Sequence, residues 1–138
     1  MSESTGVDEQ ATKLMHDAMP YAAELGIEAV TATKELVRTR LAWAASRCTA
    51  GGALHGGVLM ALADATGGLA AFLNLPEGAA GTSTIESKTN FLRPLRSGYA
   101  TATARPLHIG RRIVVAETEI HDDAGKLVAK VTQTQAVL

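Results

Sequence analysis

The chain has 138 residues and a formal net charge of −1. This length suits a single domain with its own core. The near-neutral charge and an aromatic content of 4% argue against a nucleic-acid-binding protein. Cys48 is the sole cysteine, which excludes an intramolecular disulfide and favours a reducing compartment. The first ten residues lack the basic start and apolar core of a signal peptide, so we expect a cytoplasmic protein.

The charges are distributed unevenly along the chain. Residues 1–35 hold seven acidic and two basic side chains, whereas residues 36–112 hold nine basic and three acidic ones. Five of the eight arginines fall late in this basic part: Arg93, Arg96, Arg105, Arg111 and Arg112. Two interpretations stay open, a solvated face and a site for the phosphate groups of a small ligand.

The N-terminal part of the chain predicts a helix followed by a strand. Residues 8–19 have helical spacing, with Leu14, Met15 and Ala18 on one side, and Pro20 ends or kinks this helix. We treat residues 1–19 as an N-terminal helical extension of one domain that spans residues 1–138. Residues 35–44 then alternate in polarity, which is typical of a strand.

A long apolar helix is predicted over residues 56–75. Its length of about 18 apolar residues raises the possibility of a membrane span. We exclude this because Asp64 lies at its centre and because nine of these twenty residues are alanine or glycine. We therefore expect a helix buried on most sides, with no membrane partner.

Further strands follow this helix, rich in β-branched residues and separated by turn signals. They cover residues 83–94, 99–109, 111–122 and 126–138. Short loops join the last three, which predicts an antiparallel meander. Together these elements predict an α+β fold, a curved antiparallel sheet of five to six strands wrapped around a long central helix. Small residues on the helix would let the sheet approach it closely.

The segment "GGALHGGVLMALADATGG" carries the candidate chemistry. Gly56 and Gly57 stand at the helix start, where free N–H groups and a partial positive charge can stabilise a carbonyl oxygen that becomes negative. A tight turn into the helix is the simpler interpretation of these glycines. Asp64 is costly on a core helix unless partnered, either by a loop or buried arginine or through a role as nucleophile or base.

The glycines at the helix start and Asp64 are far apart along the helix. Gly56 and Asp64 are eight residues apart, or roughly 12 Å along one helix axis. One ester or thioester carbonyl cannot contact both within one chain. If both act on the same substrate, two helices must lie antiparallel in a symmetric dimer.

Motifs for other chemistries are missing from the sequence. It has no G-x-S-x-G elbow, no H-E-x-x-H or cysteine pair for zinc, and no G-x-G-x-x-G. We therefore expect neither a metal nor another cofactor, and we interpret Cys48 as structural or incidental.

The segments "LHGGVLMALADATGG", "TNFLRP", "PLHIGRR" and "DDAGKLVAKVTQT" occur in this order. They resemble the hotdog-fold acyl-CoA thioesterases, above all the phenylacetyl-CoA (PaaI-type) and 4-hydroxybenzoyl-CoA (Arthrobacter-type) branch. The resemblance runs from about Pro20 to the C-terminus. It implies hydrolysis of a small aromatic or medium-chain acyl-CoA, and homodimers that pair into tetramers.

The resemblance also implies roles for individual residues. Asp64 matches the catalytic carboxylate, Gly56 of the partner subunit the oxyanion-binding N–H, and His55 the histidine that holds the thioester end. Thr84 matches a Ser or Thr after the helix. Thr49 stands where some relatives have Gln or Asn, which weakens a polar assistant there. The motifs add further substrate-binding candidates: Gly57, Asn90, Arg93, His108, Arg111 and Arg112. The three arginines are the candidates for the CoA phosphates.

The resemblance leaves the acyl group open. Asp rather than Glu at position 64 favours the phenylacetyl type, whereas "PLHIGRR" resembles 1,4-dihydroxy-2-naphthoyl-CoA hydrolases. Two other functions remain as hypotheses. One is a hotdog hydratase or dehydratase, whose different His-containing motif is missing from this chain. The other is a non-catalytic acyl-CoA sensor, which would share the glycine and arginine features.

Overall fold

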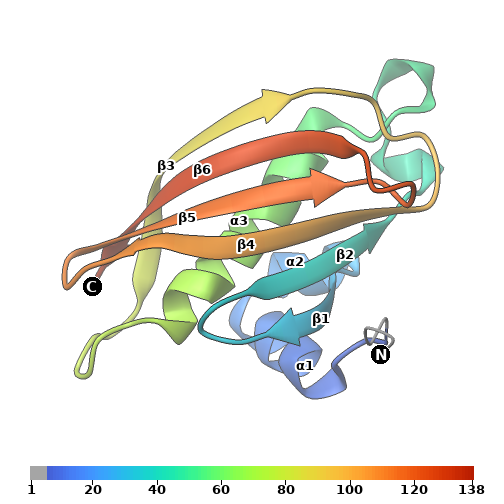
Figure 1. Ribbon diagram of the computed structural model, residues 1–138. Coiled ribbons are helices and arrows are strands. Elements are labelled where there is room, and N and C mark those ends of the chain that lie inside the picture. The colour runs from blue at the N-terminus through green and yellow to red at the C-terminus, as the bar shows by residue number, and fades with distance from the viewer. Residues whose placement is uncertain (1–5) are drawn as a thin grey trace.

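The computed structural model describes residues 6–138 and shows a six-stranded antiparallel sheet wrapped around one long helix (Figure 1). The sheet order is β1-β2-β4-β5-β6-β3. The strands are β1 Glu28–Ala32, β2 Val37–Ala42, β3 Thr82–Phe91, β4 Tyr99–Ile109, β5 Ile113–His121 and β6 Leu127–Val137. The helices are α1 Glu9–Ala18, α2 Pro20–Leu25 and α3 Gly56–Leu73, with two short 3-10 turns, Ala45–Arg47 and Ala50–Gly52, before α3. The predicted architecture and the meander of β4, β5 and β6 are confirmed.

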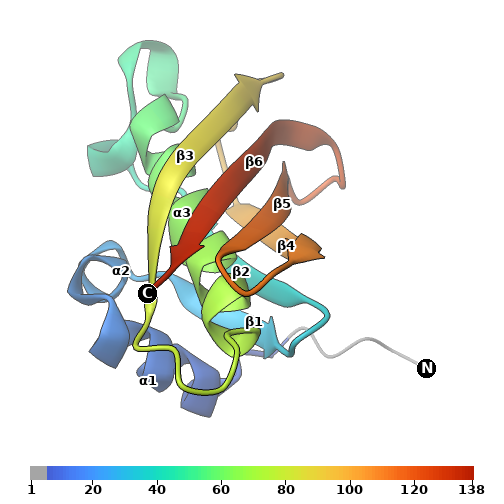
Figure 2. The ribbon, with the colours of Figure 1, turned by 90° about the vertical axis from the view of Figure 1, so that its left-hand side faces the viewer.

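The N-terminal helices lie beside β1 and part of α3, on the side that the sheet leaves open, as the turned view in Figure 2 shows. Asp8 caps α1 by accepting a hydrogen bond from the Ala11 N–H, and Pro20 starts α2 at a position where a missing N–H is tolerated. The Thr12 hydroxyl accepts from the Ala29 N–H and thereby ties α1 to β1. Helices α1 and α2 are thus part of the packed fold, whereas residues 1–5 of the predicted extension lie outside the described residues.

Strand β1 is the one strand that the alternation in the sequence does not reveal. It pairs with β2, but the register shifts between Ala29 and Thr31. Such a bulge adds one residue and breaks the two-residue period on which strand prediction depends.

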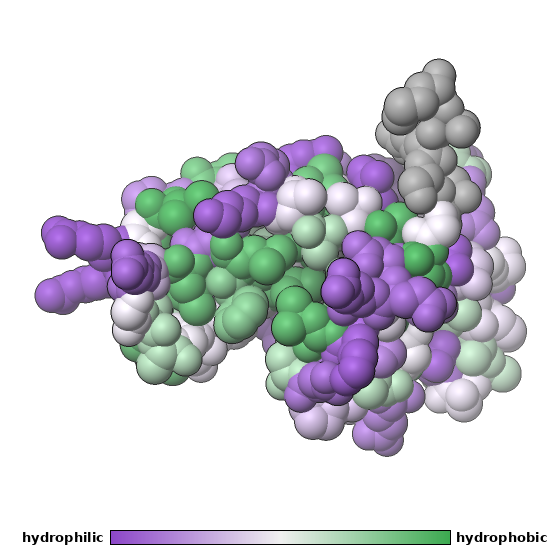
Figure 3. Space-filling model, turned by 90° about the horizontal axis from the view of Figure 1, so that it is seen from below, coloured by the Kyte–Doolittle hydropathy of each residue, from purple (hydrophilic) through white to green (hydrophobic). Residues whose placement is uncertain are grey.

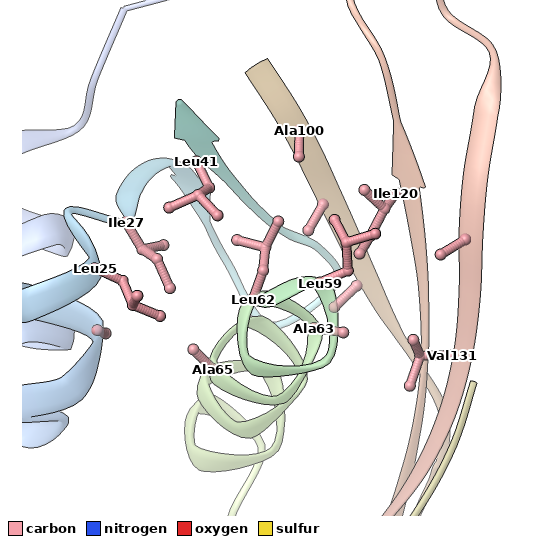
Figure 4. Packing of buried hydrophobic residues seen from close by; sticks show 14 of the residues in the cluster. Leu25, Ile27, Leu41, Leu59, Leu62, Ala63, Ala65, Ala100, Ile120 and Val131 are labelled. Atoms are coloured by element: carbon pink, nitrogen blue, oxygen red, sulfur yellow. The ribbon is translucent and has the colours of Figure 1, made fainter. Parts of the chain in front are cut away.

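The core lies between the concave face of the sheet and α3 (Figure 4). Leu62, Leu41 and Ile120 are fully buried there, and each contributes roughly 1.5–3 kcal/mol by leaving water. Inside this layer the Thr39 and Thr66 hydroxyls are hydrogen-bonded to each other at 2.7 Å. Five alanines on the sheet face let the helix approach it: Ala100, Ala102, Ala104, Ala116 and Ala129.

Helix α3 is covered on most sides but has one exposed face. It is long and apolar enough to cross a membrane, but half of its residues are buried inside the fold. An exposed stripe runs along its outer face through Gly57, Met60, Asp64 and Phe72. Only these four of its eighteen residues are exposed, so α3 is buried or half-buried on most sides, as predicted, and the stripe is the face that neither the sheet nor the N-terminal helices cover.

Candidate active site

Asp64 projects from the exposed face of α3 and is anchored through one of its two oxygens. Its Oδ1 accepts a hydrogen bond of 2.7 Å from the Thr84 hydroxyl and one of 3.2 Å from Gln133 Nε2. Among residues 6–138, no donor is within hydrogen-bonding distance of Oδ2. The partners expected for a structural aspartate, a capped loop or a buried arginine, are therefore replaced by a hydroxyl and an amide.

A bulge in β3 directs Thr84 toward α3. Thr84 pairs with Gln135, but Glu86 pairs with Thr134, so Ile85 is the extra residue. The bulge lets Thr84 and Ser87 both face the helix, while Glu86 faces the outside of the sheet. Bulges commonly redirect side chains beside active sites.

The glutamines Gln133 and Gln135 are functional candidates that the sequence patterns did not single out. They are 0% and 1% exposed, and the Gln135 amide donates to the Thr84 hydroxyl. The signal was present in "VAKVTQTQAV", where the alternation puts both glutamines on the buried face of a strand. Buried amides require partners, and Asp64 and Thr84 provide them.

An apolar hollow of about 320 Å³ opens beside Asp64. Asp64, Thr84 and Gln135 form its polar part. Its apolar wall consists of Leu14, Ala18, Met19, Leu69 and Phe72. A second hollow of about 290 Å³, between α2 and α3, also contains Met19 and Asp64 in its lining. In the view from below, apolar side chains gather across the middle of the surface between hydrophilic projections (Figure 3). The carboxylate thus borders space that suits an apolar group.

The start of α3 presents a different environment. The His55 side chain caps the helix by accepting the Gly57 N–H at 2.8 Å, so this N–H already has an acceptor. Gly56 is the first residue of α3, and its N–H has no acceptor within the helix. A Cβ at Gly56 would lie 3.1 Å from the Phe91 ring, so glycine suits this close contact.

Gly56 and Asp64 line separate hollows within one chain. Gly56 shares a hollow of about 350 Å³ with Phe91 and Arg93, whereas Asp64 lines the two hollows beside α1 and α2. Gly56 and Asp64 are therefore separated along the helix, as its geometry predicts, and they also face different parts of the surface.

The other predicted binding residues are dispersed over the chain. His108, Arg111 and Arg112 line a hollow of about 570 Å³ at the turn between β4 and β5. This turn lies at the same end of the sheet as Thr84, since Ile113 and Ser83 both pair with Ala136. Arg93 is at the opposite end of β3, beside Gly56.

Thr49 and Asn90 are not in contact with Asp64. Thr49 is exposed in the loop before α3, and its N–H donates to the Ala53 carbonyl. The Asn90 side chain accepts a hydrogen bond from Lys88 and pairs along the backbone with Lys130. Within residues 6–138, no three His, Cys, Asp or Glu side chains are grouped as metal ligands would be.

The fold and this arrangement agree with one family of proteins. A profile of the thioesterase superfamily matches residues 51–129, more than half of the chain. A crystal structure of a thioesterase from Haemophilus influenzae superposes with a TM-score of 0.86 at 32% identity, covering 97% of this chain and 92% of that one. The chain therefore belongs to the thioesterase superfamily and has the hotdog fold.

Two further similarities are to proteins of Escherichia coli. The 1,4-dihydroxy-2-naphthoyl-CoA hydrolase of Escherichia coli is 36% identical over 87 residues, 63% of each chain. The Escherichia coli PaaI protein of the phenylacetic acid degradation operon superposes with a TM-score of 0.82 at 24% identity, over 94% of this chain and 92% of that one, which shows a shared fold. The chain spans about three fifths of the length of the first curated relatives it matches, 62% and 56%.

Proposed function

We propose that the protein hydrolyses acyl-CoA thioesters that carry a small aromatic or medium-chain acyl group. The observation that carries this proposal is the carboxylate of Asp64, held through Oδ1 at the edge of an apolar hollow with Oδ2 free. A thioester needs an activated oxygen nucleophile at its carbonyl and an apolar environment for its acyl group. The similarity to a naphthoyl-CoA hydrolase supports the same substrate class.

In the proposed reaction, the oxygen of water ends in the free acid and the C–S bond breaks. Asp64 either removes a proton from the attacking water or attacks the carbonyl carbon itself, forming an anhydride that water then opens. Both routes use the free Oδ2. The negative charge that develops on the carbonyl oxygen is stabilised by the N–H of Gly56 at the positive end of a helix. The departing CoA thiolate takes up a proton.

We propose that this Gly56 belongs to a second copy of the chain. Strand β3 is at the edge of the sheet and leaves one side of its backbone without a strand partner. Thr84, near one end of β3, binds Asp64, and Phe91, at the other end, covers Gly56. Antiparallel pairing of two β3 strands would therefore bring Gly56 of one copy toward Asp64 of the other.

Charges along β3 support this pairing. A two-fold axis at Ser87 would place Glu86 of each copy opposite Lys88 of the other, which is a favourable cross-strand pair. The same symmetry would bring Arg93 of one copy toward Arg111 and Arg112 of the other, where they can bind the CoA phosphates. We propose a homodimer in the cytoplasm, assembled further into a dimer of dimers.

A panel of acyl-CoA substrates tests the proposed activity. Thiol release from benzoyl-, phenylacetyl-, naphthoyl-, hexanoyl- and decanoyl-CoA, followed with a thiol reagent, should show turnover for at least one aromatic or medium-chain substrate. Acetyl-CoA should be a poor substrate because it leaves the apolar hollow empty. Tight binding of these compounds without thiol release would instead indicate a sensor.

A further inference from the structure

Two buried glutamines on β6 stand out in a sheet face whose other buried polar residues, Thr39 and Thr118, are small threonines. Gln133 and Gln135 are 0% and 1% exposed, and their neighbour Val131 on the same face is an ordinary core residue. An amide in such a position is unfavourable unless its polar atoms are hydrogen-bonded. Their presence therefore requires a reason beyond filling the core.

Both amides are hydrogen-bonded to the same atom, Oδ1 of Asp64, one directly and the other through Thr84. Gln133 Nε2 donates to it directly at 3.2 Å. Gln135 Nε2 donates to the Thr84 hydroxyl, and this hydroxyl donates to Oδ1 at 2.7 Å. A carboxylate only accepts hydrogen bonds, so it determines which end of the Gln133 amide faces it. The Thr84 hydroxyl accepts from Gln135 and so directs its own proton to Asp64.

The packing around Gln133 favours the hydrogen bond from its amide nitrogen to Asp64 over hydrogen bonding by its amide oxygen. Its Oε1 is buried without a hydrogen-bond partner among the described residues. This oxygen lies against Gly67, where an added Cβ would be only 2.0 Å away. A buried orphan acceptor and a glycine inside a helix are both unfavourable. An apolar side chain at position 133 would avoid both, but it would leave Asp64 without its direct donor.

We infer that Gln133 and Gln135 are positioning residues that hold the Asp64 carboxylate for the proposed hydrolysis, Gln133 directly and Gln135 through Thr84. This inference rests on the proposed function only for its effect on turnover. With Oδ1 held from two sides, rotation of the carboxylate is restricted and Oδ2 stays directed away from the sheet. Such restriction lowers the entropic part of the barrier to reaction.

The direct contact of Gln133 with Asp64 and the indirect contact of Gln135 through Thr84 predict different coupling in double-mutant cycles. Thr84→Val and Gln135→Met should each lower kcat about ten-fold, because each removes one hydrogen bond to a charged group or its support. Because Gln135 acts through Thr84, the double variant should be no slower than Thr84→Val alone. Gln133→Met combined with Thr84→Val should lose about ten-fold more than either single variant. Thr84→Ser should restore most of the activity.

Thr118→Val is the matched control for these variants. Thr118 is equally buried, pairs with Val131 on the same sheet face and has a hydroxyl without a partner among residues 6–138, but it does not contact Asp64. It should keep wild-type kcat. Independent, multiplicative losses for Gln135→Met and Thr84→Val would overturn the relay through Thr84.

A spectroscopic measurement tests the contacts without any assay of activity. The chain has three glutamines, so the side-chain NH₂ signals of Gln133 and Gln135 can be assigned by ¹H–¹⁵N NMR. We expect the Gln133 signals to move strongly in Asp64→Ala, and the Gln135 signals to move in Thr84→Val. Gln10, in α1, should not respond to either change. Unchanged Gln133 and Gln135 signals would overturn the inference, whether or not the protein hydrolyses thioesters.

Discussion

Asp64 is the residue on which the proposed chemistry depends. Asp64→Asn is nearly isosteric, and the amide oxygen can still accept hydrogen bonds from Thr84 and Gln133. The amide can neither attack a carbonyl nor take a proton from water as the carboxylate does. We therefore expect an unchanged fold and almost no thiol release. Thiol release above about a tenth of the wild-type rate would remove Asp64 from the mechanism.

The three arginines proposed to bind the CoA phosphates would have no role in the chemical step. Changing Arg93, Arg111 and Arg112 together to alanine should raise KM roughly ten-fold or more, because charge-assisted contacts to phosphates are lost. These contacts are equally strong in the ground and transition states, so kcat should change little. Steady-state kinetics at two salt concentrations measure this. The difference from wild type should shrink at high salt because the side chains are exposed.

Arg105 provides the control for the arginine variants. It lies on the outward side of β4, paired with Glu117 along the backbone, and lines none of the hollows described above. Arg105→Ala should keep the wild-type KM. A normal KM in the triple variant would place the CoA phosphates elsewhere.

At the scale of elements, α3 must approach β6 closely at one point. Gly67→Ala would place its Cβ against the Gln133 amide in a buried position, and we expect a loss of roughly 1–3 kcal/mol in unfolding free energy together with a lower kcat. Gly68→Ala is the matched control, since a Cβ there meets nothing within 4 Å. It should leave stability unchanged or raise it by up to about 1 kcal/mol. Denaturant unfolding of both variants measures the difference, and equal stability would contradict the packing described.

Helix α1 supplies one wall of the hollow beside Asp64. Leu14 is 43% exposed and borders this hollow opposite Phe72 and Leu69. Leu14→Phe should reduce the space for the acyl group and lower kcat/KM for decanoyl-CoA more than for hexanoyl-CoA. The ratio of the two values checks this. An unchanged ratio would mean that the acyl group binds away from α1.

The helices and strands differ in how well their sequence predicts them. Alternation locates β2 and β4 to β6, and the apolar run locates α3, because one physical period dominates each stretch. Alternation fails to predict β1, where a bulge shifts the register. Asp64 and Thr84 could be selected from motifs and resemblance. Gln133 could not, because its role depends on which residue of α3 lies opposite a strand that is 69 residues away in the sequence.

At the scale of the whole molecule, the proposed active site needs groups from two chains. Gly56 and Asp64 line separate hollows of the same chain, and β3 presents an open edge that carries Thr84 and Phe91 near its two ends. Pairing of two such edges joins a carboxylate from one copy with a helix N-terminus from the other. Symmetry then creates two equivalent sites.

Complementation between two inactive variants tests most directly whether each active site is shared between two chains. One variant carries Asp64→Asn and the other Gly56→Pro, which removes the N–H at a helix position where proline is tolerated. In a mixed dimer one site is intact and the other lacks both groups. After co-refolding at equal concentrations, half of the dimers are mixed, so thiol release should recover to about a quarter of the wild-type rate. If mixed dimers form, as seen by native mass spectrometry, and no activity returns, each site is built within one chain and the account is wrong.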